Sequence, residues 1–207
     1  MKKSILCAAI ISVLALSVIT FKGYDVAKSA NPQTNQNVIH RNTVYDADVT
    51  KPEFLNNQSD VVVIGKIVNK NASAKGKLSV GLQEDVVYTD TNVKVETVVI
   101  NKTSNQIKHG DTLTVRNLGG TADNLTMITD TDGVLKQDKN DKKVLLFLAD
   151  LSRDLSLPQG GTQTTTYSIV GGFHGSFSLS GDGGEATRDV SGEKIKTDDL
   201  VKLLKNK

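Results

Sequence analysis

The chain has 207 residues with 25 basic and 23 acidic side chains, and aromatic residues make up only 4% of it. Domains that bind nucleic acid need a basic stripe or aromatic rings on which bases stack, so this composition predicts no nucleic-acid partner. Residues 1–30 carry four lysines and one aspartate, which leaves 21 basic and 22 acidic side chains in residues 31–207.

The N-terminal segment, residues 1–30, has the three-part layout of a secretory signal. Two lysines precede an apolar run from Ile5 to Phe21, and a polar stretch with small residues follows. The run is close to the lower length limit of a membrane span, so an uncleaved signal-anchor stays an alternative. We favour cleavage, after Ser29 or Ala30. The protein is then secreted or extracytoplasmic and membrane-anchored, with membrane contact only through this segment if it stays uncleaved.

The chain has one cysteine, Cys7, and it lies inside the apolar run without the small residues that precede a lipidated cysteine. The mature chain therefore has no disulfide, thiolate metal site or thiol nucleophile. Export without disulfides behind a two-lysine start is typical of a Gram-positive bacterium. The remaining length, about 177 residues, suits one domain with a buried core.

Residues 31–49 are polar and lack sustained periodicity, which predicts a flexible linker in which His40 is a solvated residue. The single β-rich domain is expected over 50–207. At its start, Thr50 is placed as the N-cap of a short helix with Pro52 in the first turn. Phe54 and Leu55 give this helix an apolar face.

The first strand is expected in SDVVVIGKIVN, from Ser59, where β-branched residues on both sides predict that its first half is covered on both faces. A polar excursion over 69–85 follows, with at most a small hairpin arm around Leu78, Val80 and Leu82.

The stretch VVYTDTNVKVETVVI alternates like a strand with one buried face. On one side it places Val93, Val95, Thr97 and Val99, and on the other Lys94, Glu96 and Val98. The Gly110-Asp111 pair then predicts a turn into the strand DTLTVRNLGG, with His109 in a surface loop.

Residues 121–142 form a second polar excursion, and the apolar run KVLLFLAD after it predicts the most buried strand. TTTYSIV and HGSFSLS are two further strands, separated by a turn at Gly171-Gly172. A C-terminal helix is expected at about 197–206, with Thr197 as its cap. Leu200, Leu203 and Leu204 form its apolar stripe. The predicted fold is mainly β: a small OB-like antiparallel barrel or sandwich with a short N-terminal helix and a C-terminal helix.

Five phrases resemble a family of uncharacterised exported proteins of Gram-positive bacteria: SDVVVIGKIVN, TNVKVETVVI, HGDTLTVRNLGG, KKVLLFLAD and YSIVGGFHGSF. Their order also resembles the OB-fold-like barrel of netrin-type and metalloproteinase-inhibitor domains. Inhibitors of that kind act through an N-terminal cysteine and disulfides, neither of which this chain has, so no inhibitory residue carries over. The chain also departs from the family at Asn140–Lys143, where a Gly-Glu turn is usual. The resemblance implies a fold and a location but no activity.

The segment around His174 raises the question of catalysis, because two serines follow it. If Phe173, Gly175, Phe177 and Leu179 face the core, the period of two puts His174, Ser176 and Ser178 on the polar face of an ordinary strand. No G-x-S-x-G elbow occurs, so we expect no catalytic residue here. The rival hypothesis is a small hydrolase that uses His174 with Ser176 or with an acidic residue such as Asp182.

Asp130-Thr131-Asp132-Gly133 hints at calcium but lacks the third ligand and the glutamate of a complete loop, so no metal or cofactor is expected. LPQGG at 157–161 lacks the Thr-Gly pair of a sorting signal. The leading hypothesis is an exported, non-enzymatic module that binds an unknown protein or envelope component. Its candidate binding loops are 69–85 and 121–142. A structural surface protein without a ligand is the third alternative.

Overall fold

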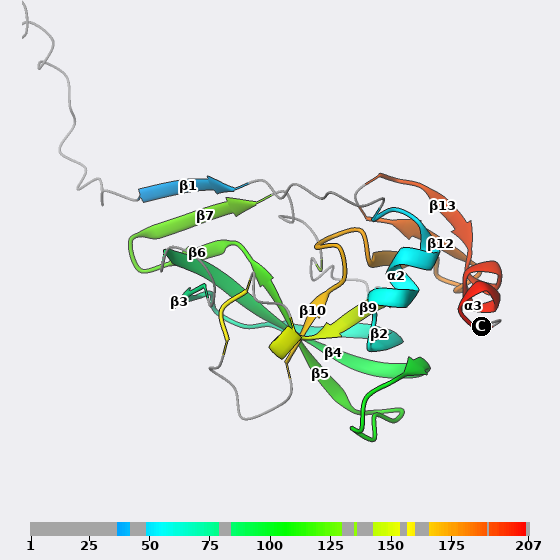
Figure 1. Ribbon diagram of the computed structural model, residues 1–207. Coiled ribbons are helices and arrows are strands. Elements are labelled where there is room, and N and C mark those ends of the chain that lie inside the picture. The colour runs from blue at the N-terminus through cyan, green and yellow to red at the C-terminus, as the bar shows by residue number, and fades with distance from the viewer. Residues whose placement is uncertain are drawn as a thin grey trace, which may run out of the picture. The chain divides into compact units, whose positions relative to one another are not determined.

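The computed structural model describes residues 37–41, 49–78, 84–129, 135, 143–153, 157–159, 166–189 and 191–205 (Figure 1). The chain divides into two units, Met1–Asn35 and Gln36–Lys207, and every described residue belongs to the second. The predicted signal at 1–30 lies outside the described residues. Within the described part of the chain, no helix is long and apolar enough to span a membrane.

The described chain is mainly β, which confirms the predicted fold class at that level (Figure 1). Its strands are β1 (Asn37–Arg41), β2 (Val61–Lys70), β3 (Ala74–Lys77), β4 (Asp85–Asn101), β5 (Thr112–Leu118), β6 (Gly120–Ala122), β7 (Leu125–Thr129), β9 (Lys143–Asp150), β10 (Thr166–Ile169), β11 (Ser176–Leu179), β12 (Glu185–Arg188) and β13 (Lys194–Lys196). Its helices are α2 (Pro52–Gln58) and α3 (Thr197–Lys205), with the 3-10 turn η1 (Leu151–Arg153).

Five strands pair in a closed ring in the order β2-β4-β5-β10-β9 and back to β2. Four of these pairings are antiparallel, and the fifth, between β5 and β10, is parallel. β11, β12 and β13 continue the sheet outward from β9, and β3 pairs with β4. β1, β7 and β6 make a separate three-stranded sheet.

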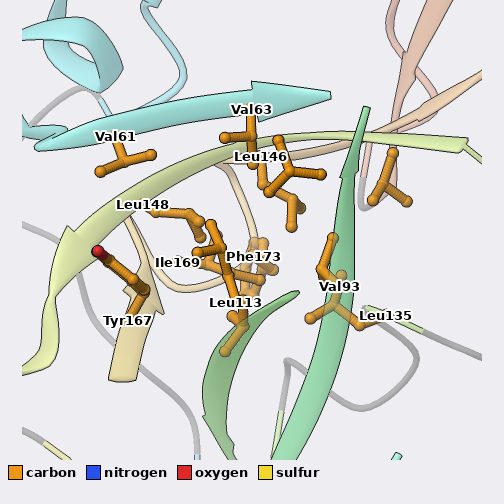
Figure 2. Packing of buried hydrophobic residues seen from close by; sticks show 13 residues of the cluster. Val61, Val63, Val93, Leu113, Leu135, Leu146, Leu148, Tyr167, Ile169 and Phe173 are labelled. Carbon is orange, nitrogen blue, oxygen red and sulfur yellow. The ribbon is translucent and has the colours of Figure 1, made fainter. Parts of the chain in front are cut away.

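The ring encloses an apolar cluster, shown in Figure 2, to which each of its five strands contributes. Alternate residues of each strand point inward, as the period of two in a strand requires. Fully buried members are Val61, Val63, Val93, Val95, Val115, Leu146 and Leu148. Each such side chain stabilises the fold by about 1.5–3 kcal/mol relative to an exposed one. This inner cluster is the reason that the five strands close on one another.

The intervening residues of β2 and β9 belong to a second cluster outside the ring. Val62, Leu145 and Phe147 pack there with residues of α2, α3, β11 and β12. β2 is therefore covered on both faces in its first half, and β9 is buried over most of its length. The burial of β2 confirms what its sequence predicts, but β9 is not the most buried strand, since β10 and β11 are buried at every position.

A β-bulge corrects the predicted alternation of β4. Thr97 pairs with Ile64 but Val95 pairs with Gly65, so Glu96 is the extra residue on β4. The bulge reverses the facing of the residues that follow it, so Val98 packs against the inner cluster and Val99 against the outer one. Placing Val99 on the side of Val93 and Val95 was therefore wrong.

Two segments expected without regular structure contain strands. Residues 120–129 form the hairpin β6–β7, in which Met127 is fully buried. Residues 37–41, inside the expected linker at 31–49, form β1 and pair in parallel with β7. In the 69–85 excursion the paired arm is β3 at Ala74–Lys77, earlier than expected, and 79–83 lie outside the described residues.

The boundaries of α3 confirm the sequence prediction, α2 extends through Asn56 and Asn57 to Gln58, and the caps of both helices differ from those expected. α2 begins at Pro52 with Lys51 in the N-cap position and no side-chain capping bond, so Thr50 is not its cap. α3 begins at Thr197 and ends at Lys205, close to the predicted 197–206. The Thr197 hydroxyl is buried with no hydrogen-bond partner among the described residues, so it does not cap α3 either. Leu200 and Leu204 are buried in the outer cluster, while the side chain of Leu203 lies outside the description.

Candidate functional site

His174 lies in a turn and not on a strand, which corrects the predicted position. Gly171 and Gly172 confirm the expected turn, since both have φ of +65°, a left-handed conformation that favours glycine. The turn continues through the bond from the His174 N–H to the Gly171 carbonyl (3.2 Å), and β11 begins only at Ser176. The His174 ring packs on Phe173, with 4.3 Å between ring centroids.

Gly175, next to His174, confirms the expected role in close packing. A Cβ atom at this position would lie 2.6 Å from the Val170 carbonyl oxygen, well inside contact distance. The Gly175 carbonyl also accepts a hydrogen bond from the Phe147 N–H (2.9 Å). The glycine thus lets the turn lie directly against β9.

Ser176 and Ser178, which the alternation places on the polar face of the strand, are both buried. Both hydroxyls donate to the carboxylate of Asp189, the Ser176 bond being 2.6 Å long. Buried hydroxyls need such partners because an unmet one costs about 1–3 kcal/mol. The pattern predicts a polar face for these serines but gives no signal for the buried partner 11 and 13 residues away.

Asp182, the acid of the hydrolase hypothesis, serves an exposed turn. Its carboxylate accepts a hydrogen bond from the Ser180 hydroxyl (2.5 Å) and another from the Gly184 N–H (3.1 Å). These bonds, the Ser180 hydroxyl first, hold the pKa of Asp182 below its usual value. Asp182 therefore accepts its hydrogen bond from Ser180, whereas Ser176 donates its hydrogen bond to Asp189. A catalytic serine instead donates its proton to an imidazole that a carboxylate orients.

Arg188 of β12 is 1% exposed and joins three separate segments. Its Nε donates to Glu193 (3.0 Å), its Nη1 to the His174 carbonyl (2.7 Å) and its Nη2 to the Thr50 carbonyl (2.7 Å). The guanidinium also lies over the ring of Phe177, 4.6 Å from its centroid. The carbonyl of His174, rather than its imidazole, therefore connects this residue to the charged group next to the serines.

A pocket of about 380 Å³ opens beside these residues, between β11, β12 and the turn after β12. Its lining includes Ser178, Ser180, Thr187, Asp189 and Gly192. No sequence motif marks this pocket, since its residues come together only through the pairing of β11 with β12.

The outer face of β4 and β5 is the second candidate, and its centre is a buried ion pair. Arg116 donates from Nε and Nη2 to the two carboxylate oxygens of Asp90, at 2.7 and 2.8 Å. Its Nη1 donates to the Pro158 carbonyl (2.8 Å), and its guanidinium lies 3.9 Å from the centre of the Tyr88 ring. Leu157 and Pro158, from the LPQGG stretch, are buried in this region. The bidentate pair fixes β4 against β5.

Beside this ion pair, polar side chains form a hydrogen-bonded ladder across β2, β4 and β5. The Thr114 hydroxyl donates to Asn92 Oδ1 (3.2 Å), Asn92 Nδ2 donates to Asn69 Oδ1 (3.0 Å), and Asn69 Nδ2 donates to Asn71 Oδ1 (2.9 Å). Asn69, Asn71 and Asn92 are close to one another because of the register of β2 with β4, which no local sequence pattern reveals. We call this set the polar ladder.

Metal binding finds no support in the described residues, where no group of three or more His, Cys, Asp or Glu could hold an ion. The calcium hint at Asp130–Gly133 lies outside the described residues. His109 is exposed in its loop, as predicted, with its Nδ1 2.8 Å from the Glu96 carbonyl oxygen. His40 is exposed on β1.

No protein-family model matches the chain, and no curated protein matches it either.

Proposed function

We propose that the chain is an exported, non-enzymatic binding module on an OB-like barrel, and that its outer β4–β5 face binds a polar protein or envelope component. The polar ladder carries this proposal. It presents side-chain amides and a hydroxyl in fixed orientation on a sheet surface, and groups that are already ordered lose less entropy when a ligand binds.

The strand pairings support the OB-like part of the proposal. An OB-fold is a five-stranded Greek-key barrel that binds ligands across its second and third strands and the loops beside them. In the ring of this chain, counted from β2, the second and third strands are β4 and β5. The polar ladder lies on these two strands, on the end of β2 and on Asn71 just after it.

The ladder leaves hydrogen-bonding capacity for a ligand. A side-chain amide offers two N–H donors and two acceptor lone pairs, and the ladder bonds of Asn92 use only part of them. Adjacent strands lie about 4.8 Å apart, so these groups repeat at a regular spacing. Lys94, exposed on β4, adds a positive charge to the same strand. A polar ligand with several donors and acceptors fits such a surface better than an apolar one.

The hydrolase hypothesis has less support, because the hydroxyl protons of Ser176 and Ser178 go to Asp189. A hydrogen bond from a serine directly to a carboxylate stabilises the fold. A catalytic serine also needs a general base that takes its proton and an oxyanion hole. The export segment at 1–30 supports the proposed location by its sequence pattern.

Affinity capture from envelope fractions of the producing organism, with mass spectrometry as the readout, tests the proposal. The bait is the chain with an affinity tag after Lys207, and the test variant replaces Asn92 and Thr114 by Ala. The matched control replaces Thr121 and Thr126 by Ala, since these exposed residues also bond across two strands (3.0 Å). We expect a saturable partner that the Asn92/Thr114 variant loses and the control retains. Equal capture by both variants contradicts the proposed face.

A further inference from the structure

The polar side chains that face the pocket beside β11 and β12 are mainly hydrogen-bond acceptors, and Leu179 adds apolar surface, so the pocket suits a ligand with a donor group on an apolar stem. We propose that it binds a ligand through a protonated amine, with Asp189 as the anionic partner. This site is separate from the polar ladder on β2, β4 and β5, so its test is independent of the proposed function.

The serines around Asp189 have no hydroxyl proton left to offer. Ser176 and Ser178 each have one hydroxyl hydrogen, and both donate it to Asp189. Ser180, on the pocket wall, donates its hydrogen to Asp182 and accepts one from the Glu185 N–H (3.0 Å). These three oxygens can therefore only accept further hydrogen bonds.

The backbone donors of the wall are also engaged. The Gly192 N–H donates to the Arg188 carbonyl (3.0 Å), and the Asp189 N–H donates to the Ser176 carbonyl (3.2 Å). The Arg188 guanidinium is buried and donates to Glu193 and to two backbone carbonyls. Thr187 adds one hydroxyl, which can both donate and accept. The pocket therefore offers few free hydrogen-bond donors to an anion.

Asp189 itself is exposed and keeps acceptor capacity. An ionised carboxylate has about four lone-pair sites, of which the two serines use two. An ammonium group brings three donors and a positive charge, and hydrogen bonds between ionised groups are about twice as strong as neutral ones. Each hydroxyl of a neutral polyol brings one donor and two acceptor lone pairs and no charge, so a polyol matches these acceptors less well.

Two cations on the strands that border the pocket, Lys194 and Arg188, are already paired. Lys194, which pairs with Thr187 across β12 and β13, contacts Glu185 at 2.9 Å, and Arg188 contacts Glu193. The two serines hold Asp189 in place before a ligand arrives. A cavity of 380 Å³ has room for an aliphatic amine, an amino sugar or a lysine side chain.

Calorimetry and amide NMR on the full chain test the site with butylammonium as the probe and butanol as its neutral control. We expect butylammonium to bind at millimolar concentration or below, to shift the amide signals of Ser178, Thr187 and Gly192, and butanol to do neither. Glucosamine against N-acetylglucosamine, and a lysine peptide against its side-chain-acetylated form, distinguish a sugar amine from a protein lysine.

The variant Asp189→Asn keeps the shape of the side chain and removes its charge, so we expect it to weaken butylammonium binding about tenfold or more. Asp182→Asn is the matched control, because Asp182 is also exposed and serine-bonded but does not line the pocket. Its affinity should stay within about twofold of the wild type. If Asp189→Asn fails to fold, the proposal is judged by the amide shifts of the wild type with butylammonium and with butanol. Absence of these shifts with all three amines, or equal binding of butanol, overturns the proposal.

Discussion

The five-stranded ring and the C-terminal layer, which consists of β11, β12, β13 and α3, each contain a buried arginine among the described residues, and the two arginines are paired differently. Arg116 in the ring and Arg188 in the layer both lie over an aromatic ring and both donate to a carboxylate and to backbone carbonyls of distant segments. Asp90, the partner of Arg116, is 9% exposed, whereas Glu193, the partner of Arg188, is 51% exposed.

This difference in exposure predicts which partners of Arg116 and Arg188 are needed for stability. In the ring, both charges are removed from water, so each depends on the other for solvation. In the layer, water reaches Glu193, and the carbonyls of His174 and Thr50 provide the buried partners of Arg188. We therefore expect the loss of a carboxylate or arginine to be costly in the ring, and the loss of Glu193 to be mild.

The largest effect is expected for Arg116→Met, which leaves Asp90 charged, buried and unpaired. The free energy of unfolding should fall by about 3–5 kcal/mol, measured by urea denaturation. Adding Asp90→Leu should recover much of this loss, because a buried ion pair can often be exchanged for apolar side chains at little cost. A loss below about 1 kcal/mol for the single variant would mean that water reaches Asp90.

A second test uses Tyr167 of β10, which lies in the inner cluster with its hydroxyl directed away from it (Figure 2). Burial raises the pKa of Tyr167 above its ordinary value near 10, although a hydrogen bond from Asn105 opposes this. Above pH 10 the folded state therefore keeps a proton that the unfolded state releases, and stability falls as pH rises.

The slope of this loss is at most about 1.4 kcal/mol per pH unit. The variant Tyr167→Phe removes it, so the difference in unfolding free energy between wild type and variant should shrink from pH 10 upward. Lysines titrate equally in both proteins and cancel in the difference. If the difference in unfolding free energy stayed constant over this pH range, the pKa of Tyr167 would be the same in the folded and unfolded states, which contradicts the prediction.

The smallest effect is expected for Glu193→Gln, which removes a half-exposed charge but keeps a hydrogen-bond acceptor for Arg188. The free energy of unfolding should fall by less than about 1 kcal/mol. Asp90→Asn is the matched change in the ring and should cost clearly more, as judged by urea denaturation of both variants. Equal losses of unfolding free energy in the two variants would contradict the proposed difference between Arg116 and Arg188.

The sequence predicts those elements whose pattern reflects burial alone. β2 and β9 are β-branched or apolar on both sides, and α3 has acidic residues in its first turn, lysines in its last turn and leucines at helical spacing, so their positions follow from local chemistry. The β6–β7 hairpin was missed because TADNLTMIT is polar overall, and only Leu125 and Met127 mark its buried side. β1 was missed because its stability depends on a partner at 125–129.

The candidate sites depend even more on pairing between distant residues. The glycines around His174 were correctly assigned to structure, since a positive φ and a close approach can be inferred from glycine itself. Asp189 and Asp90, by contrast, have no local feature that marks them. Their partners, the serines of β11 and Arg116, reach them only through strand register, and one shift such as the bulge at Glu96 changes which side chains meet.

Closure of the ring by β10 also governs when the protein can fold. Thr166 pairs with Thr114 in β5, and Val61 pairs with Leu148 in β9, so the contacts that complete the ring join residues far apart in the chain. Folds dominated by such contacts form in milliseconds to seconds, because loop entropy is lost before the contacts are gained. A chain that emerges from a ribosome as an extended polymer therefore stays open until Ile169 has emerged, and only then can β10 complete the ring.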